Sequence, residues 1–213
     1  YVPGKLTVSK RSNPGWPGYR PGGSSASVKK DAEEEDDSLS FVDVRKGAYY
    51  YDAVSWAVKQ GVIDGVGGNR FAPDDLCTRA QIVTLLWRAA GSPAPKAPAS
   101  VTDVSPEAYY AKAVAWAVEA GVATGTGSGR FSPDAPCTRA QAVAFLYRAF
   151  GAAAVSGETG FRDVAADAYY AQAVLWAVNK HVAAGVAEGL FAPDQACTRA
   201  QIAAFLYRAY TAK

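Results

Sequence analysis

The sequence is built around an internal repeat with a period of 60 residues. The pentapeptide Cys-Thr-Arg-Ala-Gln begins at Cys77, Cys137 and Cys197, so its copies recur every 60 positions without an insertion. A shorter motif ending in Asp-Val, at residues 41–44, returns at the same interval. A unit of this length is usually unable to close a core alone, so we expect neighbouring copies to complete one another.

The repeat divides the chain into four segments. We expect a Gly/Pro/Ser-rich and acidic linker over residues 1–40, followed by repeats at 41–100, 101–160 and 161–213. The linker composition cannot bury enough apolar surface to offset the ordering of its backbone, which predicts a solvated tether. The alternative is that this segment is a peptide ligand for another protein.

Composition excludes several functional classes. The 213 residues are 49% hydrophobic, which suffices for a core, and the net charge of +2 provides no strong field for nucleic acid. No apolar run is long enough for a membrane span, so we expect neither nucleic-acid binding nor membrane insertion. No secretion signal is apparent, and we expect a mature chain or an excised fragment. A single histidine, His181, argues against an enzyme and His-rich metal sites, and we expect no metal or cofactor.

Each repeat carries two helical patterns. Residues 49–60 place apolar side chains at helical spacing, and Gly61 follows as a glycine at the helix end. His181 stands in the place of that glycine in the third repeat, so we expect it to adopt a left-handed conformation rather than act as a general base. Between the helices, a Gly-rich turn leading to Phe71 predicts a tight loop closed by an aromatic ring, and the equivalent rings are Phe131 and Phe191.

The second helix opens with a capping box. Thr78 provides the N-cap hydroxyl, and Gln81 lies three residues later. The apolar face that follows is wider than one short partner helix can cover, so we expect the three second helices to form a common bundle. The predicted fold is all-α, with three helix-loop-helix repeats in a pseudo-threefold arrangement around a central three-helix bundle.

A cysteine precedes each N-cap, at Cys77, Cys137 and Cys197. A residue there commonly packs on the first helical turn, which predicts a small buried side chain. Two alternatives remain. The three thiols together could bind zinc, although a spacing of 60 is no local chelate signature, or two of them could form a disulfide and leave the third unpaired.

An arginine occupies the first position of each capped helix. A guanidinium beside the unpaired N–H groups of a helix N-terminus would make a site for a carboxylate or phosphate. Equally, each arginine could pair with the aspartate of the Asp-Val motif. The arginines are Arg79, Arg139 and Arg199, and the aspartates are Asp43, Asp103 and Asp163.

Aromatic residues suggest a sugar ligand. One tryptophan in each repeat, at Trp56, Trp116 and Trp176, lies beside the apolar stripe of the first helix. A half-exposed indole is a common platform for a sugar ring, and the alternative is a residue at the boundary of the core. Arginine, tryptophan, paired tyrosines and glycine, repeated three times, suit an acidic saccharide.

These motifs together resemble the surface-layer homology (SLH) family. The matching segments are Phe-Val-Asp-Val at 41–44, the aromatic-led helix at 49–62, the Gly-to-Pro loop at 65–73 and the capping box at 77–81, and the later copies match too. The resemblance covers residues 41–210. It implies a three-pronged assembly with grooves between the prongs.

The resemblance also implies a function. Members of the family anchor surface proteins without catalysis, by binding secondary cell-wall polysaccharide that often carries a ketal-pyruvate carboxylate. We therefore expect an extracellular module in the cell wall or S-layer of a Gram-positive-type bacterium, monomeric and attached to an upstream cargo domain. The alternative is a structural or protein-interaction module with no glycan ligand, in which the arginines pair internally.

The family motif can be carried over to individual residues. The arginines and aspartates named above map to motif positions, as do the loop glycines Gly65, Gly125 and Gly185, and the tryptophans are added on their own chemistry. The family's glutamate is replaced by Gln81, Gln141 and Gln201, which can still cap a helix but carry no charge. In the third repeat Ala187 and Leu190 replace Gly67 and Arg70, so we expect a weaker or differently shaped third groove.

Overall fold

The computed structural model describes residues 39–212, so the linker expected over 1–40 lies almost entirely outside the described part. Two helices occur in each repeat, and no strand occurs within 39–212, which confirms the all-α class. The helices are α1 (Tyr51–Lys59), α2 (Arg79–Ala89), α3 (Ala111–Glu119), α4 (Arg139–Ala149), α5 (Ala171–Asn179) and α6 (Arg199–Thr211). No helix in this part of the chain has both the length and the apolar character needed to cross a bilayer.

Local sequence signals set the helix ends as expected. The Thr78 hydroxyl accepts the backbone N–H of Gln81 at 3.2 Å, and the Gln81 side-chain oxygen accepts the N–H of Thr78 at 3.0 Å. The same capping box opens α4 and α6. His181 has a φ of +55°, close to the +65° of Gly61, so the histidine does replace a helix-ending glycine. α1 begins at Tyr51 rather than Tyr49, because residues 48–51 form a hydrogen-bonded turn first.

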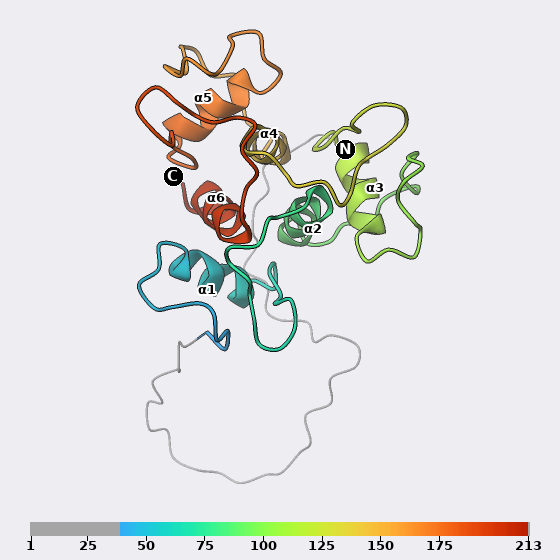
Figure 1. The fold of residues 1–213 in the computed structure, drawn as a ribbon. Helices are drawn as coiled ribbons and strands as arrows, with labels where there is room; N and C mark the ends of the chain where they lie inside the picture. The colour runs from blue at the N-terminus through green and yellow to red at the C-terminus, as the bar shows by residue number, and fades with distance from the viewer. Residues whose placement is uncertain (1–38, 213) are drawn as a thin grey trace, which may run out of the picture.

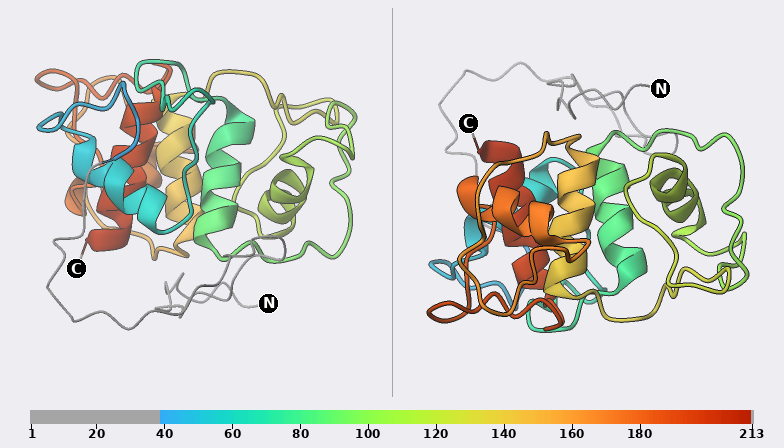
Figure 2. Two further views of the ribbon diagram at one scale, coloured as in Figure 1. Left: turned by 90° about the horizontal axis from the view of Figure 1, so that it is seen from below. Right: turned by 90° about the horizontal axis from the view of Figure 1, so that it is seen from above.

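The three second helices form the centre of the molecule. Figure 1 shows α2, α4 and α6 together in the middle, and Figure 2 shows them side by side. Around them, α3 packs on α2, α5 packs on α4, and α1 packs on α6. Each first helix therefore packs on the second helix of the preceding repeat, with the first repeat closing the circle on the third. The expectation that neighbouring copies complete one core is confirmed.

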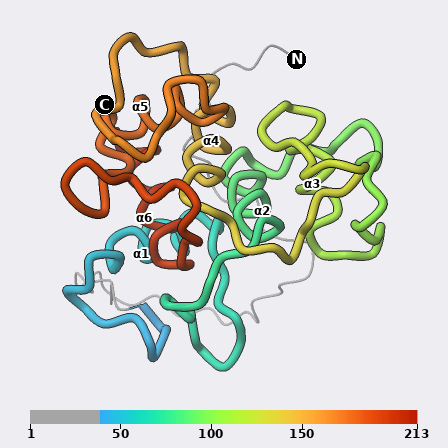
Figure 3. Tube along the Cα trace, turned by 45° about the horizontal axis from the view of Figure 1, so that its top comes forward, coloured from blue at the N-terminus to red at the C-terminus, as the bar shows by residue number. Residues whose placement is uncertain are grey.

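A ring of backbone hydrogen bonds joins the N-terminal ends of the central helices. Cys137 donates its N–H to the carbonyl of Cys77, and Cys197 donates to Cys137, at 2.8 and 2.9 Å. Figure 3 shows the segments leading into α2, α4 and α6 converging on the centre. All three thiols are fully buried and none forms a disulfide, so the buried-thiol prediction is confirmed and the disulfide alternative is wrong.

Candidate functional site

Each motif aspartate holds the loop between the two helices of its own repeat. The two carboxylate oxygens of Asp43 accept the backbone N–H groups of Phe71 and Ala72, both at 2.8 Å. Asp103 and Asp163 do the same one and two repeats later. Burial works to raise the pKa of Asp43, but these donors outweigh it and keep the pKa below its usual range. The aspartates therefore fix the loop and do not pair with the arginines of the capping boxes.

The motif glycine is required by a close backbone approach. A Cβ on Gly65 would lie 2.6 Å from the carbonyl oxygen of Arg70, because the loop folds back so that Val66 donates to that same carbonyl. The corresponding distances are 2.6 Å at Gly125 and 2.7 Å at Gly185. Any larger residue at these positions would push the loop open, so the glycines set its shape.

The motif arginines connect one repeat to the next. Arg79 donates from Nε to the carbonyl of Phe131 and from Nη2 to that of Thr124, both at 2.9 Å, and its guanidinium carbon lies 4.8 Å from the centre of the Phe131 ring. Arg139 makes the same contacts one repeat later. Arg79 and Arg139 are only 3% and 4% exposed. Their partners are carbonyls, so both sequence-based expectations, an open anion site and an aspartate pair, are wrong for these two.

The N-termini of the central helices are also occupied. The N–H of Arg79 donates to the carbonyl of Ala135, the N–H of Ala80 donates to that of Pro133, and the third N–H is capped by Thr78. Loop carbonyls of the next repeat fill the equivalent positions on α4 and α6. The expected anion site on unpaired N–H groups is therefore absent from all three helices, because the repeats cap one another.

Arg199 is the motif arginine that reaches a groove. Its Nε donates to the carbonyl of Phe71 at 2.8 Å, but its Nη2 lies 3.4 Å from the carbonyl of Asp64. We call the surrounding cavity of ≈ 260 Å³ groove A. Its lining draws on all three repeats and consists of Asp64, Gly65, Val66, Gln81, Thr84, Leu85, Arg88, Tyr109 and Arg199.

The lining of groove A also includes Arg88 and Tyr109, which were not assigned to a site from the sequence. Arg88 lies 2.7 Å from a carboxylate oxygen of Asp64, which holds its guanidinium at the groove. Tyr109 is 67% exposed and rests edge-on against Tyr110. Burial raises the pKa of Tyr109, so its hydroxyl is a neutral hydrogen-bonding group. The recurrence of the Tyr-Tyr pair was the available signal, but which groove it borders depends on packing between repeats.

The tryptophans do not form the expected sugar platform. Trp116 and Trp176 are each 7% exposed, and Trp176 packs on Tyr147 and Phe150 at 5.9 and 6.2 Å between ring centres. Trp56 is partly buried against Tyr207 and Tyr210. Trp56 and Trp176 fill the contacts between a first helix and the preceding repeat, and Trp116 belongs to the buried core, so burial favours the core-boundary alternative.

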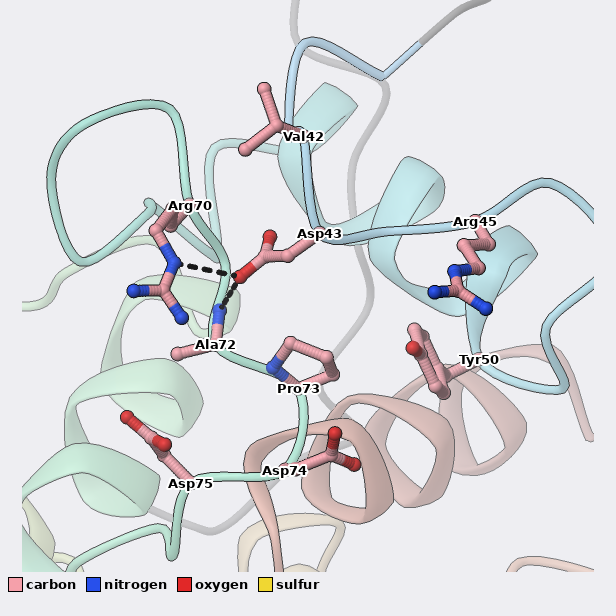
Figure 4. Close-up of a pocket in the computed structure, with 9 residues that line it drawn as sticks. All are labelled: Val42, Asp43, Arg45, Tyr50, Arg70, Ala72, Pro73, Asp74 and Asp75. Carbon is pink, nitrogen blue, oxygen red and sulfur yellow. Dashed lines mark hydrogen bonds and ion pairs between the residues drawn. The ribbon is translucent and has the colours of Figure 1, made fainter.

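A larger cleft of ≈ 550 Å³ is lined by the Asp-Val motif and the loop of the first repeat. Figure 4 shows Arg70 bridged to Asp43 on one side, with Arg45 and Tyr50 on the other and two more carboxylates below. Those carboxylates belong to Asp74 and Asp75. Three acids against two arginines make this cleft a poor site for an anion. Within residues 39–212, no group of His, Cys, Asp and Glu is arranged to hold a metal ion.

Comparison with known proteins identifies the repeat. The S-layer homology domain model matches residues 40–83, 102–143 and 160–203. An endoglucanase of Bacillus sp. (strain KSM-635) is 33% identical over 80% of this chain and 19% of its own length. A cell surface protein of Thermoanaerobacter kivui is 33% identical over 52% of the chain and 15% of its own length. A surface-layer 125 kDa protein of Lysinibacillus sphaericus is 35% identical over 53% of the chain and 10% of its own length.

The chain thus spans less than a fifth of the length of each of these relatives. The three family matches fall on the three structural repeats, and each covers the first helix, the loop and the start of the second helix. The chain belongs to the S-layer homology domain family, of which it carries three tandem copies.

Proposed function

We propose that this chain is a non-catalytic module that anchors a surface protein to the cell wall by binding an acidic secondary cell-wall polysaccharide. The family and the relatives named as cell surface and surface-layer proteins support a surface role. The endoglucanase relative is far longer than this chain, which fits a module joined to separate cargo. The proposed location is the extracellular cell wall or S-layer, with no cofactor, and the module is a monomer.

The accessible guanidinium of Arg199 carries this proposal. Its Nε donates to a carbonyl, while the longer 3.4 Å contact leaves the outer nitrogens available to donate two parallel hydrogen bonds to a carboxylate. Arg88 supplies a second positive charge beside it, positioned by Asp64. Tyr109 offers an exposed aromatic face to the C–H groups of a sugar ring. A pyruvate ketal provides such a carboxylate on a sugar.

The candidate ligand residues take different parts in this proposal. Arg199, Gly65 and Gln81 line groove A and are proposed to contact the glycan. The aspartates and the remaining motif glycines are proposed to position the loops that border the grooves. The other residues proposed from the sequence stand at equivalent places in the second and third repeats or in the helix contacts: Arg79, Arg139, Gln141, Gln201, Trp56, Trp116 and Trp176.

The experiment measures retention of the full chain on purified wall polymer before and after mild acid removal of pyruvate. We expect retention by the untreated polymer, loss after treatment, and loss in Arg199→Gln. The matched control is Arg45→Gln, which removes the same charge from the larger cleft and should bind normally. Equal retention by both polymers would overturn carboxylate recognition, and no retention by either would favour the protein-interaction alternative.

A further inference from the structure

The pseudo-threefold arrangement repeats the elements of groove A at two further places. Groove B is defined here by Arg79, Thr124, Gln141, Phe145, Arg148 and Tyr169. Groove C is defined by Arg139, Ala184, Gln201, Phe205, Arg208 and Tyr49. In each case the motif arginine of one repeat donates to the loop of the next repeat, as Arg199 does in groove A. The three places share their backbone plan, so differences between them come from side chains.

The decisive difference lies on the central helices. Groove A has Leu85 where grooves B and C have phenylalanine. The guanidinium carbon of Arg79 lies 5.3 Å from the ring centre of Phe145, and that of Arg139 lies 5.6 Å from the ring centre of Phe205. Each of these arginines also contacts the loop aromatic, Phe131 or Phe191. Two aromatic rings therefore enclose the guanidinium in grooves B and C.

Arg199 contacts one aromatic ring, that of Phe71, at 4.9 Å. The exposures follow the same division, because Arg79 and Arg139 are buried while Arg199 is partly exposed. The hydrogen bonds from Nη2 agree, at 2.9 Å for Arg79 and 2.7 Å for Arg139 against 3.4 Å for Arg199. In grooves B and C, where phenylalanine stands at this position, the arginine is buried and makes short hydrogen bonds. In groove A, where Leu85 stands there, the arginine is partly exposed and its second hydrogen bond is longer.

Charge distinguishes groove A as well. Asp64 pairs with Arg88 there, whereas Thr124 and Ala184 stand in its place in the other two grooves. Two arginines and one aspartate leave groove A with one net positive charge. That balance suits a sugar unit with a single carboxylate better than one with several anionic groups.

From these observations we infer that the chain takes one monoanionic sugar unit, in groove A, and that Leu85 determines this by leaving Arg199 uncovered. The inference rests on the proposed function, and it adds which of the three repeats' arginines binds and which side chain decides it. Because Phe145 and Phe205 cover Arg79 and Arg139, these two arginines join the repeats and do not bind the sugar.

The test is calorimetric titration of the full chain with a short synthetic saccharide that ends in a pyruvate ketal. We expect one site per chain. Leu85→Phe should weaken binding at least about tenfold, because a ring would cover Arg199. Val42→Phe, which adds a ring at an exposed residue outside groove A, should bind as the unchanged chain does. Phe145→Leu should uncover Arg79 and add a second site. Thermal unfolding of every variant checks that the fold is retained.

The outcomes separate this inference from the proposed function. Three equal sites in the unchanged chain would overturn the inference and leave glycan anchoring intact. The same holds if folded Leu85→Phe binds normally, or if Phe145→Leu gains no site. Absence of any binding by the unchanged chain would overturn the proposed carboxylate recognition itself. If Leu85→Phe fails to fold, the number of sites still tests the inference, because we expect one site in the unchanged chain and two in Phe145→Leu.

Discussion

Cys77 donates its backbone N–H to the carbonyl of Cys197 at 2.9 Å, although the two residues are 120 positions apart in the sequence. This bond closes a three-membered ring in which every cysteine both donates to and accepts from another. The side chains lie fully buried beside it. The repeats therefore form a closed circle rather than an open stack, and the first repeat is tied directly to the last.

The closed ring predicts inert thiols. Burial raises the pKa of Cys77 to about 12, and it raises the pKa of Cys137 still further. At pH 8 almost no thiolate is present, and reagent has no access to the sulfur. We expect a disulfide reagent such as DTNB to leave all three cysteines unmodified in the native chain and to titrate three after denaturation. Rapid labelling of the native protein would contradict the buried ring.

Replacement of Arg79 by alanine should lower the free energy of unfolding more than replacement of Arg199. Arg79→Ala leaves the buried carbonyl of Phe131 and the partly buried carbonyl of Thr124 without a donor, and we expect a loss of roughly 2–3 kcal/mol in the free energy of unfolding. Arg199→Ala should cost less, because its second contact is long and partly exposed. Urea denaturation measures both values, with Arg45→Ala as the surface control. A larger loss in Arg199→Ala would contradict the assignment of Arg79 to structure.

The aspartate contacts predict loss of stability in acid. The pKa of Asp103 in the folded chain lies below its ordinary value, since backbone donors from Phe131 and Ser132 and the nearby Arg130 outweigh the effect of burial. Its contribution is therefore fully present above about pH 4 and is lost as the pH falls through the lower, folded pKa. The unfolding temperature should drop in that acid range.

The variant Asp103→Asn tests this origin of the acid sensitivity. It should be less stable at neutral pH, because the amide has one acceptor oxygen where the carboxylate has two, and its NH2 group would face one of the two backbone N–H donors. Its stability should also change less between pH 6 and the acid range than that of the unchanged chain. If the variant loses as much stability in acid as the unchanged chain, the pH dependence comes from other groups.

His181 offers a stabilising substitution. Its φ of +55° lies in the left-handed region, which costs a residue with a Cβ roughly 1–2 kcal/mol relative to glycine. Glycine also raises the conformational entropy of the unfolded chain, which offsets part of this gain in stability. We expect His181→Gly to raise the free energy of unfolding by about 0.5–1 kcal/mol. Gly121→Ala, at the same place in the second repeat, should destabilise, and a loss in His181→Gly would contradict the capping role.

The sequence predicts those parts of the fold that depend on neighbours along the chain. The capping box joins Thr78 to a residue three positions away, and the glycine that ends α1 acts within one turn. The arginine contacts could not be read in this way. Arg79 binds a carbonyl 52 positions away, in the next repeat, so its burial depends on how the repeats pack.

The same reason explains the errors at the candidate site. Trp176 lies beside an apolar stripe in the sequence, but α4 of the preceding repeat covers it. The sequence shows that Leu85 stands where the second repeat has Phe145. It does not show that this position lies beside the guanidinium of a motif arginine from another repeat. The expectation of a weaker third groove rested on Ala187 and Leu190, and it stays a prediction. The difference on which our inference rests lies at Leu85, which lines groove A.

A crystal structure of the chain bound to a pyruvylated saccharide tests the central claim most directly. We predict the pyruvate carboxylate within hydrogen-bonding distance of the outer nitrogens of Arg199, with the sugar ring against Tyr109 and grooves B and C empty. A saccharide seated in the cleft between Asp43 and Asp75, or equally in all three grooves, would contradict the account.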